Sequence, residues 1–171
     1  MKNKKALAIL ILISVSLIAL PLFAQEKATP EDVYEKVMEA AAYLSEKGDA
    51  ALSEFNATDG QWVFKDTYIF VYDCDKGICA AIPSTINIVG KKIEDIKDIN
   101  GLPVGNILCE TSKKPNGGWM EYMWPVLGTD EIKKKISFIY RAPGATYTVG
   151  AGIYAPEGIT VEELNKKLEE K

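Results

Sequence analysis

The hydrophobic period of the chain changes near Asp59 and Gly60, and this change constrains the fold more than any other feature of the sequence. Before it, apolar residues recur at the spacing of one helix face, at Val33, Val37, Ala40, Ala41 and Leu44. After it, β-branched and aromatic residues alternate with period two, which is typical of strands. Helices followed by strands, rather than alternating with them, predict an α+β architecture.

The helical part has clear boundaries. Thr29 is a suitable N-cap, Pro30 suits the first turn, and acidic residues follow at Glu31 and Asp32. Gly48 is a good terminator, and Asp49 caps a second short helix over 50–55. We therefore expect one long helix and one short helix before the strands begin.

Five strands are expected, at 68–72, 78–82, 119–124, 135–141 and 146–154. The first two form a hairpin around Gly77. Glycines and prolines punctuate 83–115, so this segment is predicted to be an irregular crossover with one helix near 104–112. The tail, 161–171, is predicted to be a short charged helix. The economical arrangement is a five-stranded antiparallel sheet backed by helices on one face.

The first 24 residues have the layout of a secretory signal peptide: three lysines, an uncharged apolar run over 6–20, and a cleavage site after Ala24. The run is shorter than the roughly 20 residues that a membrane span requires. We expect cleavage and a single domain, 25–171, outside the cytoplasm. The alternative is an uncleaved N-terminal segment that anchors the domain to the membrane.

The composition excludes several functions. There is no histidine among 171 residues, which excludes imidazole bases, Ser-His-Asp and Cys-His pairs, and histidine metal ligands. A net charge of −4 with interspersed signs makes nucleic acid an unsuitable partner. Glu94 and Asp98 are four residues apart, but nothing holds them in a recognisable catalytic geometry. We expect no enzyme activity, no cofactor and no metal.

Export favours a disulfide, because oxidising compartments let such bonds persist. Cys74 and Cys79 flank the Gly77 turn, so a Cys74–Cys79 bond is predicted, with Cys109 left over. The spacing is not that of a CxxC redox or zinc motif, which favours a structural role.

Several segments, in this order, resemble the single Cache domain of extracytoplasmic sensors: 48–52, 68–73, 77–83, 89–101, 118–125, 135–138 and 150–154. The resemblance covers roughly 30–154. It implies a PAS-like fold in which a long N-terminal helix packs behind the sheet, and a small-ligand pocket lies between the other sheet face and the crossover. Free-standing members are thought to act as exported binding proteins or as partners of a separate membrane receptor. Small organic acids are the ligand class most associated with this branch. Ile82 stands before Pro83 where the family commonly has histidine.

A site for a small carboxylate needs a few donors in an apolar and aromatic cavity. Lys135 opens a strand that matches the family and shares a face with Ser137; the other interpretation is the solvated end of a basic run with Lys133 and Lys134. Arg141, the single arginine of the sequence, lies on that face too. Aromatic side chains are placed toward the pocket because the aliphatic ones suit packing on the long helix: Tyr68, Phe70, Tyr122 and Trp124.

The sequence thus supports an exported, non-catalytic module that binds a small organic acid or a similar metabolite. The alternative is an interaction module with a vestigial pocket, in which helix 31–47 mediates pairing with a second copy or with a membrane receptor.

Overall fold

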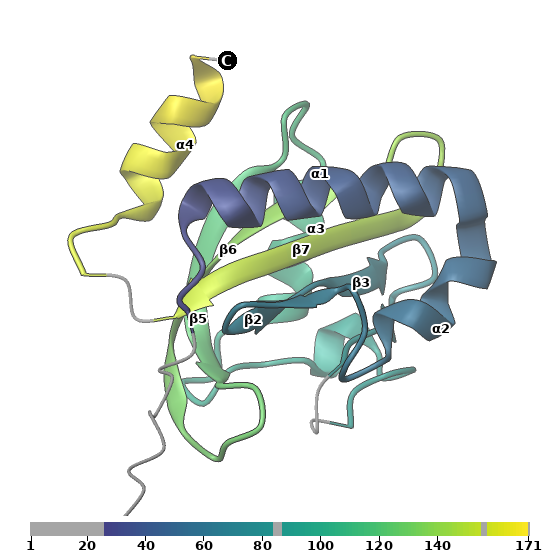
Figure 1. Cartoon of the computed structure of the whole chain (residues 1–171), viewed down its shortest axis with the longest axis horizontal. Helices are drawn as coiled ribbons and strands as arrows, with labels where there is room; N and C mark the ends of the chain where they lie inside the picture. Colours follow the sequence, from purple (N-terminus) through teal and green to yellow (C-terminus); the bar gives the residue numbers. More distant parts are fainter. Residues whose placement is uncertain (1–25, 84–86, 155–156, 171) are drawn as a thin grey trace, which may run out of the picture.

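The computed structural model describes residues 26–83, 87–154 and 157–170, and the expected signal peptide lies outside them. Helix α1 (Pro30–Lys47) comes first (Figure 1). Its N-terminus is closed reciprocally: the Thr29 hydroxyl accepts the Asp32 N–H, and the Asp32 carboxylate accepts the Thr29 N–H. The predicted boundaries and apolar face of the long helix are confirmed.

A five-stranded antiparallel sheet forms the centre of the fold, as predicted. Its strands, in the order in which they pair, are β4 (Ile78–Ala81), β3 (Phe70–Asp73), β7 (Tyr147–Tyr154), β6 (Ile132–Arg141) and β5 (Gly118–Pro125). Short elements complete the chain: η1 (Gly48–Ala51), α2 (Leu52–Phe55), β1 (Val63–Phe64), β2 (Thr67–Tyr68), η2 (Ile93–Asp95), α3 (Val104–Ser112) and α4 (Val161–Glu169). The small β1–β2 hairpin was not predicted, because each of its strands is only two residues long.

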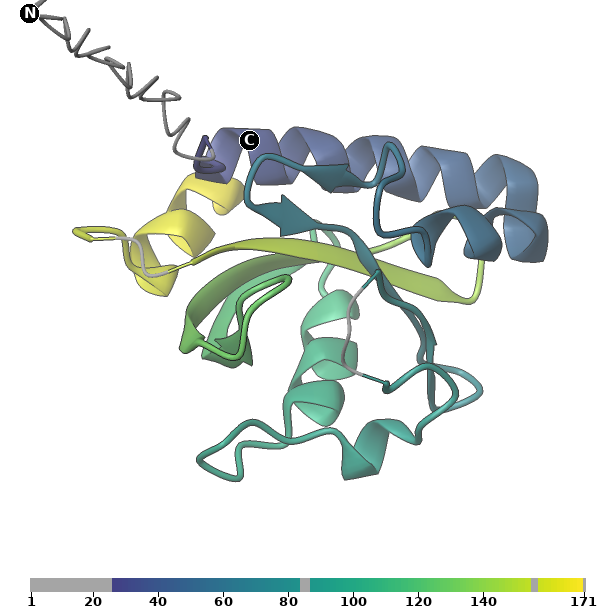
Figure 2. The same cartoon turned by 60° about the horizontal axis from the view of Figure 1, so that its bottom comes forward.

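The two faces of the sheet carry different cores. Figure 2 shows α1 on one side of the sheet and α3 on the other. Ile69 and Val71 face α1, whereas Phe70 and Tyr72 pack beneath the crossover that holds η2 and α3. The predicted placement of Ile69 and Val71 toward α1, and of the aromatic residues of the same strand toward the crossover, agrees with this packing.

The C-terminal helix covers the outer strand of the sheet. Leu164 and Leu168 of α4 are buried in the α1-side core. The Asn165 side chain accepts the Trp119 N–H at 2.8 Å and donates to the Trp119 carbonyl at 3.1 Å. These bonds satisfy backbone groups on the edge strand β5 that would otherwise be open to another strand. Among the described residues, no helix is both long and apolar enough to cross a lipid bilayer.

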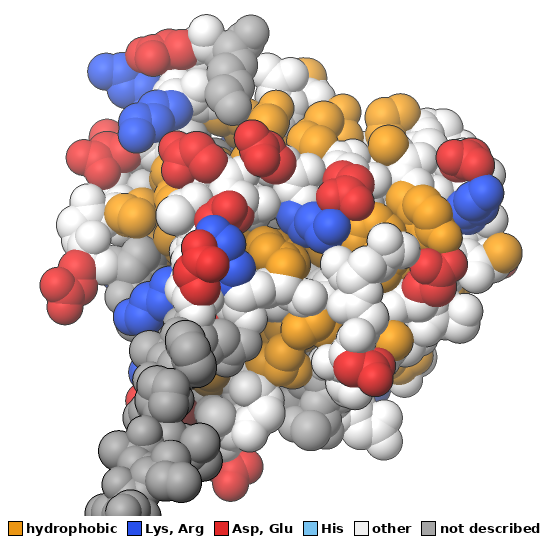
Figure 3. All heavy atoms as spheres, viewed as in Figure 1, with side chains coloured by type: hydrophobic (Ala, Val, Ile, Leu, Met, Phe, Trp, Pro, Cys, Tyr) orange, Lys and Arg blue, Asp and Glu red, His pale blue; other side chains and the backbone are white. Residues whose placement is uncertain are grey.

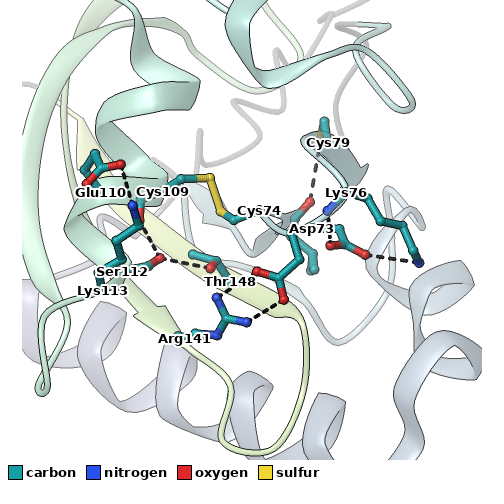
Figure 4. Close-up of a disulfide and its surroundings, with 12 residues drawn as sticks. Asp73, Cys74, Lys76, Cys79, Cys109, Glu110, Ser112, Lys113, Arg141 and Thr148 are labelled. Carbon is teal, nitrogen blue, oxygen red and sulfur yellow. Dashed lines mark hydrogen bonds and ion pairs between the residues drawn. A yellow bond between two sulfur atoms is a disulfide. The ribbon is translucent and has the colours of Figure 1, made fainter.

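The predicted Cys74–Cys79 bond is wrong. Cys74 is joined to Cys109 of α3, with the two Cα atoms 5.7 Å apart, and Cys79 is a buried thiol (Figure 4). The reason is register: Cys79 pairs with Tyr72 across the hairpin, so Cys74 lies diagonally from it. Diagonal residues are about 7–8 Å apart, beyond the usual range for a disulfide.

We predict that peptide mapping without reductant recovers a Cys74–Cys109 cross-link, and that Cys74→Ser with Cys109→Ser lowers the free energy of unfolding by about 4 kcal/mol, since the bond spans a sequence separation of 35. Urea denaturation measures the loss, with Cys79→Ala as the control that keeps the bond. Recovery of a Cys74–Cys79 peptide would contradict the fold described here.

Candidate functional site

The most unusual residue of the crossover-side core is Lys135, whose side chain is fully buried (0% exposed). Its Nζ donates to the Tyr154 hydroxyl at 3.2 Å. It also lies over three aromatic rings, with centroids at 3.9 Å for Tyr68, 4.7 Å for Tyr154 and 5.6 Å for Phe70. The ammonium group is therefore enclosed by aromatic side chains rather than by water or carboxylates.

Strand pairing positions this group. Lys135 pairs with Tyr122 on β5 and with Tyr154 on β7, so it lies inside the sheet and not at its edge. Alternation along β6 directs Lys135 and Ser137 to the crossover side. Of the basic run, only this lysine is buried: Lys134 is exposed and Lys133 is half-buried. The structure thus decides between the two interpretations of Lys135 in favour of a buried position.

Hydrogen bonds fix the polar atoms around Lys135. The hydroxyls of Tyr122 and Ser137 are 3.0 Å apart, and Trp124 Nε1 donates to the Tyr68 hydroxyl at 3.1 Å. Burial raises the pKa of Tyr122 and Tyr68, and also that of Tyr154, so all three phenols stay protonated at neutral pH. The site therefore combines one cation with several hydroxyl groups, surrounded by aromatic rings.

Among the described residues, no carboxylate forms an ion pair with Lys135. Within the part of the chain that the structure describes, the Tyr154 hydroxyl is the one hydrogen-bond acceptor of Lys135, although an ammonium has three donors. Burial lowers the pKa of Lys135 to about 7, and the carboxylate of Asp66 opposes this shift. The ring faces offset part of the cost of burying the charge. A buried amine with unused hydrogen-bond donors would favour the binding of an anion.

Arg141, the other predicted cation, does not belong to this site. It lies six residues further along β6 and forms an ion pair with Asp75 in the β3–β4 turn, with nitrogen-to-oxygen distances of 2.7 and 3.2 Å. Six residues of a strand span about 20 Å, so its guanidinium is remote from Lys135. The structure brings the other predicted residues together: Lys135, Tyr68, Phe70, Tyr122, Trp124 and Ser137.

Two residues that sequence reasoning did not select contribute to the site. Tyr154 binds the ammonium, and Asp66 acts on it electrostatically. The β6–β7 register brings Tyr154 close to Lys135, and the β1–β2 hairpin carries Asp66. The hydrophobic periodicity of the sequence predicts neither feature. A surface cavity of about 420 Å³ is lined by both residues together with Lys27–Pro30, Ile153, Glu157 and Ile159, but Lys135 itself does not line it.

The two acidic residues considered for catalysis make separate interactions. Glu94 is exposed and pairs with Lys92, whereas the Asp98 carboxylate accepts the backbone N–H groups of Asn100, Leu102 and Met123. The described residues hold no group of three or more acidic or cysteine side chains that could bind a metal ion. On the face seen in Figure 3, acidic and basic side chains are interspersed and form no extended basic patch.

The fold is an antiparallel sheet with the long helix α1 on one face and the crossover that holds η2 and α3 on the other. A sequence model of the Cache domain matches residues 34–157, so the chain belongs to the Cache domain family, as its resemblance predicted. The Cache domain family is one of sensor domains.

Solved structures agree on this fold. The chain is similar to a methyl-accepting chemotaxis protein from Vibrio parahaemolyticus RIMD 2210633, with 22% identity, a TM-score of 0.59, and coverage of 72% of this chain and 86% of the other. It is similar to the periplasmic sensor domain of a chemotaxis protein, with 22% identity, a TM-score of 0.54, and 72% and 88% coverage. A Cache chemosensory domain described for its carboxylic acid recognition shows 24% identity, a TM-score of 0.57, and 75% and 100% coverage.

We predict that the buried ammonium makes stability depend on pH. Lys135 has a lower pKa in the folded chain, about 7, than in the unfolded chain, 10.5, so the unfolded chain holds more protons between these values and stability rises with pH across that window. Lys135→Met should therefore be more stable than the wild type at pH 6, by about 1–4 kcal/mol, and this margin should shrink toward pH 10.

Urea denaturation at a series of pH values measures the margin. Lys134→Met, which removes an exposed charge from the neighbouring position, is the matched control and should show no such change with pH. A margin for Lys135→Met that stays constant from pH 6 to pH 10 would contradict the lowered pKa.

Proposed function

We propose that this Cache domain is an extracytoplasmic, non-catalytic sensor domain that binds a small carboxylate at Lys135. The observation that carries the proposal is the fully buried ammonium, which has aromatic rings and one hydroxyl around it but no carboxylate of residues 26–83, 87–154 or 157–170 paired with it. The similar Cache domain described for carboxylic acid recognition supports the ligand class. The Cys74–Cys109 disulfide supports an oxidising compartment.

A carboxylate supplies what Lys135 lacks. The anion would accept from the two ammonium donors that the Tyr154 hydroxyl leaves unused. The hydroxyls of Tyr122 and Ser137, on the neighbouring strand and on the same strand, offer further polar contacts. The rings of Tyr68 and Phe70 would pack against a short apolar tail.

The packing restricts the size of the ligand. Side chains of the crossover-side core surround Lys135, and this residue lines neither the 420 Å³ cavity nor a larger one of about 600 Å³ near Cys74. Binding therefore requires an aromatic side chain to move, and each additional carbon of the ligand requires a larger displacement from a close-packed interior. Acids of two to four carbons fit this requirement best.

Binding should also take up a proton at alkaline pH. The pKa of Lys135 is about 7 in the empty domain, and an adjacent carboxylate would raise it because opposite charges stabilise each other. Affinity for the acid should therefore fall as the pH increases above 7, by up to tenfold per pH unit until the pKa of the complex is reached.

We predict that acetate or propionate raises the melting temperature of the purified protein at pH 6.5, because a ligand that binds only the folded state stabilises it. Propionamide, which has the same shape without the charge, should have no effect. Lys135→Met should abolish the shift, and Lys134→Met should retain it. Equal shifts with propionamide, or a full shift in Lys135→Met, would contradict a site built on this ammonium.

A second candidate function is that of an interaction module whose pocket is filled. Ile82, which replaces the histidine common in the family, is buried in the crossover-side core, and this favours the alternative. On this account the domain pairs with a second copy or with a membrane receptor. If no short-chain acid shifts the melting temperature and the protein sediments as a dimer, the interaction function replaces the sensor function.

A further inference from the structure

The Cys74–Cys109 disulfide connects the sheet to the crossover helix α3. Cys74 follows the last residue of β3, and Cys109 lies in the middle of α3. That helix covers the crossover-side core through Val104 and Leu108, which are both buried in the same cluster as Tyr68 and Phe70. Figure 4 shows the sulfur bridge between the sheet and the helix, with Cys79 apart from it.

The bond is accessible from outside. Both cysteines are half-buried, and both line an open cavity of about 600 Å³ together with Lys76, Gly77, Lys92–Glu94, Asn106 and Glu110. Two of these charged side chains are basic and two are acidic, so the cavity neither attracts nor repels a thiolate strongly. Cys79, in contrast, is fully buried, and burial raises the pKa of its thiol to about 12. A small thiol can therefore reach the disulfide but not Cys79.

Apart from the disulfide, polar connections between α3 and the strands are few. Among the described residues, one hydrogen bond joins them: Thr148 of β7 donates to the Ser112 hydroxyl at 3.1 Å. The crossover before α3 is held separately, by the backbone bonds of Gly90 and Ile93 to the β4 hairpin and by the Asp98 carboxylate at Met123. Without the disulfide, α3 keeps its apolar contacts but loses its covalent connection to the sheet.

We propose that the Cys74–Cys109 disulfide is a thiol-exchange site at which a dithiol reductant, entering through the 600 Å³ cavity, loosens α3 over the crossover-side core. A thiolate of the reductant attacks one sulfur and forms a mixed disulfide, and the other cysteine leaves as a thiolate that takes up a proton. The second thiol of the reductant then displaces the first cysteine. The products are two cysteine thiols and the oxidised cyclic dithiol.

The exchange is tested by reducing the native protein with dithiothreitol, blocking thiols with N-ethylmaleimide and weighing the intact chain. We expect two adducts, on Cys74 and Cys109, at a rate that low concentrations of urea do not change, while Cys79 stays unlabelled. Cys79→Ala should give the same two adducts. Reduction that occurs only at the rate of global unfolding, with all three cysteines labelled together, would overturn the proposal.

The loosening is tested by hydrogen exchange on oxidised and reduced protein. Amides of Val104–Ser112 should exchange at least tenfold faster after reduction, whereas those of α1 should not change, and Cys74→Ser with Cys109→Ser should reproduce this result. Unchanged exchange in α3 would overturn the proposal.

The consequence for binding rests on the proposed function. Reduction should weaken propionate binding at least fivefold. If the oxidised protein binds no short-chain acid, the proposed function fails, whereas the labelling and exchange results still decide the thiol-exchange site.

Discussion

One buried charge constrains what the crossover side of the sheet can do. The ammonium of Lys135 is enclosed by aromatic rings inside the sheet, and its burial costs free energy that no described ion pair repays. Such a residue reduces stability unless something compensates for it. An anionic ligand would compensate, and this requirement links the family's sensor role to a particular atom of this chain.

The division of the sheet into two faces makes this possible. Aliphatic residues such as Ile69 and Val71 pack under α1 and form a core that does not involve the site. The opposite face is free to carry polar and aromatic groups because the fold does not rely on it alone. The crossover covers that face, and the disulfide at Cys109 fixes its helix to β3.

The parts of this account that the sequence could predict are those governed by local period. Alternation along β6 was sufficient to place Lys135 and Ser137 on one face, and capping residues defined α1. The sequence does not predict contacts that depend on tertiary register. Tyr154 contacts Lys135 because β6 and β7 pair, and Cys109 bonds to Cys74 because of the path of the crossover. Arg141 was assigned to the site because it has the right face, but its partner Asp75 lies in a turn that alternation does not describe.

Titration of the Lys135 side chain tests most directly whether this buried amine pairs with an anionic ligand. NMR of protein carrying isotope-labelled lysine can follow the side-chain resonances of Lys135 with pH, assigned by comparison with Lys135→Met. The account predicts a pKa near 7 in the empty domain and a clearly higher value with saturating propionate. A pKa close to 10.5 that does not respond to the acid would contradict it.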